Sequence, residues 1–326
     1  MEAASVPQAG STVGRSRGLR DRLGDKLFYG LTAAASLISV LLVLAIIWRI
    51  FKGAWPAIQH FGLTFIANNV WNAPLDQFGA RDLIIGTIVT SFGAMLLSAP
   101  LSVAIALFLS ELAPPAIRGP AATLIEMLAA VPSVVIGLWG IYVLAPFSAQ
   151  HLQPAVSSVL GWLPVFANGR DKSESTVFTA ILVLTIMTIP ITSSICRELF
   201  LGVPQELEEG AVGLGATRWE TVKTVTVPSV RGGVIAAVIL GLGRALGEAI
   251  AVTQVIGNFI PLQRSIFEPG DTLASRVANQ YQGAITDLQV SSLIYLALIL
   301  LVISFLANFG AQLIVKRFEG KLQGAS

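Results

Sequence analysis

Charged residues are scarce in this sequence, and cysteine and histidine are nearly absent. Only 12% of the 326 residues are charged, whereas 54% are hydrophobic. The single cysteine, Cys196, excludes a disulfide within the chain and supplies no thiolate cluster. The two histidines, His60 and His151, have no carboxylate pattern around them, so no metal site is predicted. The composition predicts an integral membrane protein, and the net charge of +2 gives no argument for binding nucleic acid.

Long apolar segments are what the chain has in abundance. A bilayer core about 30 Å thick needs roughly 20 apolar residues of helix. Backbone groups in lipid must be paired, and the alternating pattern of barrel strands is absent. The sequence therefore predicts an all-α integral membrane protein with six transmembrane helices. The predicted spans cover residues 27–48, 83–109, 121–147, 177–196, 233–257 and 292–315.

Lysine and arginine lie mostly on one side of these predicted spans. Thirteen basic residues lie on that side, which is formed by both tails, the short second connection and the loop at 197–232. Seven lie on the other side. Both termini are therefore predicted to be cytoplasmic. Residues 1–26 lack periodicity and are rich in Ser, Gly, Arg and Ala, which predicts a disordered basic tail. Residues 27–49 are predicted to be a retained first helix, residues 83–315 the core with the other spans, and residues 316–326 a second tail.

The loop at 197–232, the only long connection on the cytoplasmic side, has structure of its own. The stretch PQELEEGAVGLGA predicts a short helix that follows Pro204 and is ended by Gly213 and Gly215. The helix dipole favours the carboxylates in its first turns, at Glu206, Glu208 and Glu209. A second amphipathic piece, TRWETVKTVTVP, ends at Pro228.

This loop resembles the coupling loop of permease subunits in ATP-binding cassette importers of type I. Their signature is E-A-A, three residues, Gly, nine residues, then I-x-L-P. The matching positions, with the same spacing throughout, are Glu209, Gly210, Ala211, Gly215 and Val225-Thr226-Val227-Pro228. The resemblance implies that the segment from Glu208 to Gly215 docks into a cytoplasmic ATPase and carries its motion into the membrane. Gly210 departs from the alanine of the signature, and valines replace its isoleucine and leucine.

Two further stretches resemble phosphate-importer permeases of the PstC type, LAAVPSVVIGLWGIYVLAP and LGLGRALGEAIAV, within a likeness that covers residues 27–318. The chain has no G-x-x-x-x-G-K-[ST] phosphate loop, so ATP must be used by partner subunits and no cofactor is expected in this chain. The resemblance implies a second, related permease subunit (PstA type), a cytoplasmic ATPase dimer (PstB type) and an extracytoplasmic phosphate-binding protein (PstS type). It also implies a multi-pass protein of the bacterial cell membrane.

Arg244 and Glu248 are the charges that lie deepest in a predicted span. A charge that faces lipid there costs several kcal/mol, so both must face protein or a watery path. Gly243 and Gly247 form a G-x-x-x-G step that lets a neighbouring helix approach. Four residues apart on a helix, the two charges can form a structural ion pair. Alternatively they line a translocation pathway, in which Arg244 donates paired hydrogen bonds to an oxyanion. Glu248 then accepts a hydrogen bond from a protonated oxyanion, and fully ionised sulfate has no O–H to donate.

Three functions remain open from the sequence. The first is a permease that imports phosphate by alternating access, and the second is a permease for another oxyanion such as molybdate or sulfate. The third is an autonomous channel or ion-coupled anion transporter. Secondary transporters tend to contain two related halves, and no repeat on that scale occurs here. No nucleophile with a base and no metal-ligand set is visible, so an enzyme is not predicted.

Overall fold

The structure is a computed structural model that describes residues 19–167 and 173–323. The chain divides into two compact units, residues 1–49 and 50–326. Six helical stretches of the described residues are long and apolar enough to cross a membrane, which confirms the predicted all-α, multi-pass architecture. They are Gly24–Phe61, Arg81–Leu112, Ser133–Leu160, Val177–Leu201, Arg218–Gly247 and Asp287–Leu313.

The first unit contains most of helix α1 (Leu19–Phe61). The helix begins within the stretch predicted to be disordered, because Leu19, Leu23 and Leu27 recur at the four-residue spacing of a helix. Residues 1–18 of that predicted tail lie outside the described residues. The predicted first span, 27–49, is helical throughout.

The second unit is a helical bundle with one small hairpin, β1 (Trp71–Asn72) paired antiparallel with β2 (Gln77–Phe78). The remaining α-helices are α2 (Thr64–Ala67), α3 (Arg81–Leu107), α4 (Pro115–Ala129), α5 (Ser133–Trp139), α6 (Ala145–Phe147), α7 (Gln153–Leu160), α8 (Val177–Leu201), α9 (Gln205–Gly213), α10 (Arg218–Thr221), α11 (Val227–Gly247), α12 (Ile250–Val255), α13 (Leu273–Gln280) and α14 (Asp287–Gln323). Three short 3-10 helices cover Ala73–Leu75, Pro164–Phe166 and Tyr281–Gly283. Helix α14 continues through 316–323, most of the predicted C-terminal tail.

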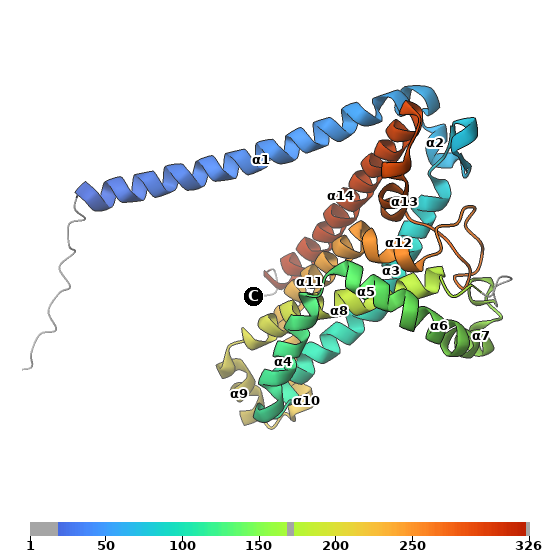
Figure 1. Cartoon of the computed structure of the whole chain (residues 1–326). Coiled ribbons are helices and arrows are strands. Elements are labelled where there is room, and N and C mark those ends of the chain that lie inside the picture. The colour runs from blue at the N-terminus through green and yellow to red at the C-terminus, as the bar shows by residue number, and fades with distance from the viewer. Residues whose placement is uncertain (1–18, 168–172, 324–326) are drawn as a thin grey trace, which may run out of the picture. The chain divides into compact units, whose positions relative to one another are not determined.

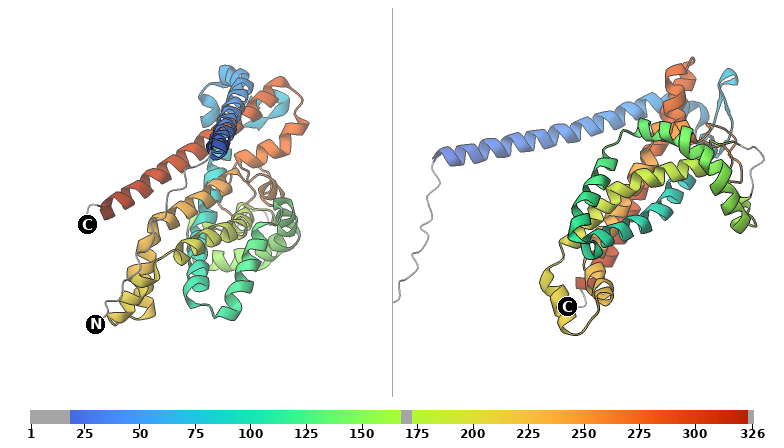
Figure 2. Two further views of the ribbon diagram at one scale, coloured as in Figure 1. Left: turned by 90° about the vertical axis from the view of Figure 1, so that its left-hand side faces the viewer. Right: turned by 60° about the horizontal axis from the view of Figure 1, so that its bottom comes forward.

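Helix α8 is the central element of this bundle. It packs against α3 and α11, and α11 packs in turn against α14 (Figures 1 and 2). In its most apolar stretch 67% of the residues are buried, a larger share than in any other candidate span of the described chain. Its apolar residues Val183, Leu184 and Met187 join one buried cluster with Val252 and Val255 of α12. The bundle is therefore organised around α8, which fixes the positions of α11 and α12 beside it.

Four π-helical segments widen the helices among the residues that the structure describes. Each is followed by one residue and then by a proline. They are Phe108–Leu112, Gly140–Leu144, Ser148–Leu152 and Val222–Thr226. In each case the residue just before the proline donates its N–H to the carbonyl five residues back. Proline lacks an N–H, and its ring collides with the carbonyl four residues before it, so the preceding turn opens into a π turn.

The third span differs from its predicted range of 121–147. Helix α4 ends at Ala129, and Pro132, in an extended conformation, precedes a new helix that begins at Ser133. The residue before a proline disfavours the helical conformation, which explains a break at this place. Through two π turns the helical path then continues to Leu160, inside the stretch predicted to be an outer loop.

A buried ion pair holds the end of the bundle that carries α13, opposite α9 and α10 (Figure 1). Arg276 Nη2 lies 2.7 Å from Asp271 Oδ2, and both side chains are at least nine-tenths buried. Burial raises the pKa of the Asp271 carboxyl, and the Arg276 guanidinium opposes this shift. The Arg276 guanidinium lies 5.7 Å from the ring centre of Trp71, which joins the hairpin to α13. Asp82 and Thr87 of α3 accept backbone hydrogen bonds from the loop and from α13, at 2.9 Å each.

Candidate functional site

A cavity of about 550 Å³ opens between α8, α11 and α14. Its polar side chains are Arg244, Glu248 and Asn308, and the remaining lining residues are Ile191, Leu240, Gly243 and Gly247. The structure therefore brings all four residues singled out from the fifth span to one cavity. It adds Asn308 of α14, which sequence reasoning missed because no spacing rule relates that helix to α11.

The predicted fifth span, 233–257, is not one continuous helix. Helix α11 ends at Gly247, Glu248 is extended with ψ 115°, and α12 begins at Ile250. Arg244 therefore lies in the last turn of α11, not in the middle of a helix. One oxygen of Glu248 accepts a hydrogen bond from the backbone N–H of Ala251 at 3.3 Å. The carboxylate thus replaces a helical hydrogen bond that the break removes, as backbone at membrane depth requires.

Arg244 and Glu248 do not form an ion pair within 4.0 Å in the part of the chain that the structure describes. The break after Gly247 is the physical reason, because the two residues no longer share a helical face. Arg244 lines the cavity and is exposed, and Glu248 is half-buried. An arginine exposed at this depth needs a polar partner, since its contact with lipid would be costly.

The two glycines of the G-x-x-x-G step have different surroundings. A Cβ at Gly243 would lie 3.4 Å from the side-chain amide atoms of Asn308, so this glycine is where α11 and α14 approach closely. A Cβ at Gly247 would meet no atom within 4 Å. Gly243 therefore contributes to helix contact, whereas Gly247 borders open space in the cavity.

The signature loop forms α9, α10 and the π turn before Pro228 at the other end of the bundle. Glu208 of α9 accepts a hydrogen bond from the hydroxyl of Thr226 at 2.8 Å. Thr226 is fully buried in the π turn, so this bond ties the two halves of the signature together. Sequence reasoning included Thr226 only as a spacing position.

Gly215 has the left-handed conformation that glycine adopts without strain, with φ +90°. The turn it makes after α9 is closed by the N–H of Ala216, which donates to the carbonyl of Ala211 at 3.1 Å. Thr217 and Glu220 then form a capping box that begins α10. The glycine of the signature is thus the residue that lets two short helices follow one another in a tight turn.

The other signature positions and their neighbours form an outward surface. Glu209 and Gly210 are exposed, and Ala211 is half-buried. Large apolar side chains also face outward here, and two of them, Leu214 and Trp219, are 92% and 69% exposed. Sequence reasoning gave neither a role, although apolar residues beside the signature glycine were a usable signal. Exposed apolar groups of this size indicate a surface that another protein covers.

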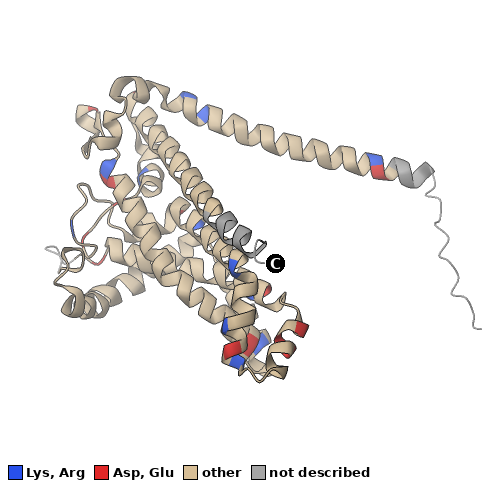
Figure 3. Cartoon of the chain, turned by 180° about the vertical axis from the view of Figure 1, so that it is seen from behind, with Lys and Arg blue, Asp and Glu red and all other residues tan. Residues whose placement is uncertain are grey.

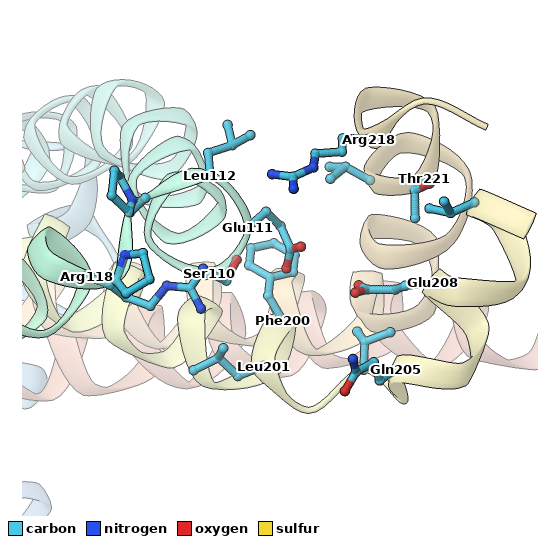
Figure 4. A pocket seen from close by; sticks show the side chains of 16 residues that line it. Ser110, Glu111, Leu112, Arg118, Phe200, Leu201, Gln205, Glu208, Arg218 and Thr221 are labelled. Carbon is cyan, nitrogen blue, oxygen red and sulfur yellow. The ribbon is translucent and has the colours of Figure 1, made fainter. Parts of the chain in front are cut away.

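Behind this surface lies a pocket of about 620 Å³ between α9, α10 and the ends of α4 and α8. Figure 4 shows Glu111 and Glu208 pointing into the same space, with Arg218 on one side and Arg118 on another. Charged residues gather at this end of the bundle, as the blue and red ribbon segments of Figure 3 show, and the spans are largely free of them. No group of three or more metal-ligating side chains occurs among the described residues.

Solved structures show which class of membrane protein has this fold. The chain is similar to a protein in the crystal structure of a bacterial alginate ABC transporter in complex with an alginate pentasaccharide-bound periplasmic protein. The similarity has a TM-score of 0.56 and covers 92% of this chain and 99% of that one, at 18% sequence identity. The fold is therefore that of the transmembrane subunit of an ATP-binding cassette importer of type I.

Sequence comparison identifies the family. Residues 100–320 match the family of binding-protein-dependent transport system inner membrane components, and the chain belongs to this family. Among its relatives is the phosphate transport system permease protein PstC of Pasteurella multocida, 40% identical over 93% of this chain and 95% of the relative. The PstC protein of Haemophilus influenzae is 41% identical over 90% of this chain and 94% of that protein. The resemblance to PstC-type permeases predicted from the sequence is confirmed.

Proposed function

We propose that this chain is the permease subunit of an ATP-driven, binding-protein-dependent importer that moves inorganic phosphate into the cytoplasm by alternating access. The observation that carries the proposal is the similarity to PstC proteins along nearly the whole chain. The chain is a transport subunit and not an enzyme. ATP is used by partner subunits, and the chain itself needs no cofactor.

The open cavity around Arg244 supports a second, related permease subunit of the PstA type as the first partner. Arg244 lines that cavity and is exposed, and a lipid-facing arginine would be costly. A second bundle placed over the cavity removes this cost and encloses one path. Arg244 then lies on that path and binds a passing oxyanion through its planar guanidinium.

The surface of α9 and α10 supports docking to a cytoplasmic ATPase dimer of the PstB type. Leu214 and Trp219 are exposed there, beside the glycine that makes the turn between the two helices. With this surface in the cytoplasm, both termini are cytoplasmic as well, as the distribution of lysine and arginine predicts. The opposite end, which carries α13, then faces an extracytoplasmic phosphate-binding protein of the PstS type. The site of action is the bacterial inner membrane.

The test is ATP-dependent uptake of radiolabelled phosphate into vesicles that contain this chain with its partner subunits and binding protein. We expect phosphate-selective uptake that excess sulfate or molybdate does not inhibit. Arg244→Gln should abolish it while the complex still assembles. The absence of ATP-dependent phosphate uptake by the assembled wild-type complex would overturn the proposed function, and uptake of sulfate or molybdate instead would reassign the substrate.

A further inference from the structure

Asn308 is the third polar side chain of the cavity that contains Arg244 and Glu248. It comes from α14, and the cavity is otherwise lined by apolar side chains and glycines. Asn308 is half-buried and lies inside the last candidate span, Asp287–Leu313. A primary amide at this depth is costly unless its polar atoms are paired, so the partners of each amide atom matter.

One side of the Asn308 amide already has a partner. Its Nδ2 donates a hydrogen bond to the backbone carbonyl of Ser304, one turn earlier in α14, at 2.9 Å. Its Oδ1 accepts no hydrogen bond from any residue that the structure describes. Because the Nδ2 bond fixes the orientation of the amide plane, the acceptor oxygen is held in place.

The neighbouring helix also restricts this amide. A Cβ at Gly243 would lie 3.4 Å from both Nδ2 and Oδ1 of Asn308. Glycine at this position therefore allows the amide to lie against α11, one residue before Arg244 in the chain. The acceptor oxygen is thus positioned by two helices in the cavity that Arg244 also lines.

We propose that Asn308 Oδ1 accepts a hydrogen bond from the protonated oxygen of a passing oxyanion. Phosphate at neutral pH carries at least one O–H and can donate to this oxygen, whereas sulfate and molybdate are fully ionised and cannot. A neutral amide accepts this bond without the charge repulsion that Glu248 exerts on an anion. One oxygen of Glu248 is moreover engaged by the N–H of Ala251. This inference rests on the proposed function, which supplies the oxyanion.

The test compares two substitutions of the same shape, Asn308→Thr and Asn308→Val. In a helix a threonine hydroxyl donates to the carbonyl four residues back, as Thr87 does to Leu83 in this chain at 2.7 Å. Its oxygen then remains an acceptor, whereas valine offers none. Ser304→Ala is the control in α14, because it keeps the backbone carbonyl that Asn308 uses.

The measured quantity is the amount of phosphate moved per ATP hydrolysed in proteoliposomes that contain the full complex and phosphate-loaded binding protein. We expect Asn308→Val to lower it by about tenfold, the effect of losing one hydrogen bond to a charged group. Asn308→Thr and Ser304→Ala should remain within about twofold of wild type, and ATP hydrolysis stimulated by the binding protein should persist in all three.

Equal losses for threonine and valine would assign Asn308 to helix packing and overturn the inference, as would wild-type coupling in both. If the valine variant does not assemble, the same comparison is made between Asn308→Ser and Asn308→Ala. A wild-type complex without phosphate uptake is a failure of the proposed function. If the wild-type complex transports phosphate and the Asn308→Val complex transports it equally well, this inference alone fails.

Discussion

The carboxylate of Glu208 accepts a hydrogen bond from the hydroxyl of Thr226, at 2.8 Å, across the turn that contains Gly215. A hydrogen bond to a charged group contributes about 1.5–3 kcal/mol. This one connects the outward-facing helix α9 with the π turn that leads into α11. Movement of α9 can therefore be transmitted directly to the membrane span that carries Arg244.

Thr226→Val removes this bond and keeps the shape of the side chain. We expect phosphate transported per ATP to fall by about tenfold, because α9 is no longer fixed to α11. Thr224→Val is the matched control: Thr224 is exposed, and its hydroxyl bonds only to the carbonyl of Glu220. Equal effects of the two substitutions in transport assays would contradict the role of the Glu208–Thr226 bond.

Gly215→Ala places a side chain in a left-handed conformation, which costs roughly 1–2 kcal/mol. We expect faster hydrogen exchange of the α9 amides and reduced phosphate uptake, with normal insertion into the membrane. Gly213→Ala tests the same change within α9, where a Cβ meets no atom within 4 Å. That control should leave uptake unchanged and make the helix slightly more stable. Normal uptake by the Gly215→Ala complex would show that the left-handed turn at Gly215 is not required for transport.

Pro228→Ala supplies the backbone N–H that proline lacks, just after the π turn Val222–Thr226. We expect the π turn to revert toward an α turn, which contains one residue fewer. Because one residue corresponds to roughly 100° of helix rotation, α10 should rotate relative to α11 by an angle of this order. ATP hydrolysis should then proceed with little phosphate uptake. Pro154→Ala removes a proline that follows another π turn, Ser148–Leu152, away from α9 and α10, and should be tolerated. A fully coupled Pro228→Ala complex would show that the π turn has no role in transmission.

Glu248→Gln keeps an oxygen for the N–H of Ala251 and removes the negative charge. The preference for phosphate over sulfate should decrease, because a carboxylate repels a fully ionised anion more strongly than an amide does. Competition assays in vesicles measure this preference. Glu126→Gln is the control, since Glu126 lines a small pocket between α4 and α8 and not the cavity. Lower transport with unchanged discrimination would exclude Glu248 as a filter.

Asp271→Asn leaves Arg276 buried without its counter-charge. Breaking a buried pair in this way costs about 3–5 kcal/mol, so thermal unfolding of the purified complex should occur at a lower temperature. The double substitution Asp271→Asn with Arg276→Gln should lower the stability by less than the sum of the two single substitutions, because the pair is then removed as a unit. Strict additivity in the melting experiment would mean that the two residues do not interact.

The sequence by itself determined the class of protein and much of the α9–α10 loop. Its long apolar runs require helices because lipid leaves no other pairing for the backbone. The spacing from Glu209 to Pro228 located α9 and the turn at Gly215. The second amphipathic piece of the loop does not end at Pro228 as predicted, because the helical path continues from α10 through the π turn into α11. The ends of the spans were less predictable, since hydropathy does not register breaks inside an apolar run. The breaks at Pro132 and after Gly247 are of this kind.

Only the tertiary structure decided how the polar residues at membrane depth are used. Arg244 and Glu248 are four residues apart, a spacing that predicts an ion pair on one helix face. The end of α11 at Gly247 separates them, and Glu248 instead binds the N–H of Ala251. Asn308 joins Arg244 only because α14 packs against α11 at Gly243. The apolar runs predict helices from local sequence, whereas contacts between distant helices depend on packing that no local pattern encodes.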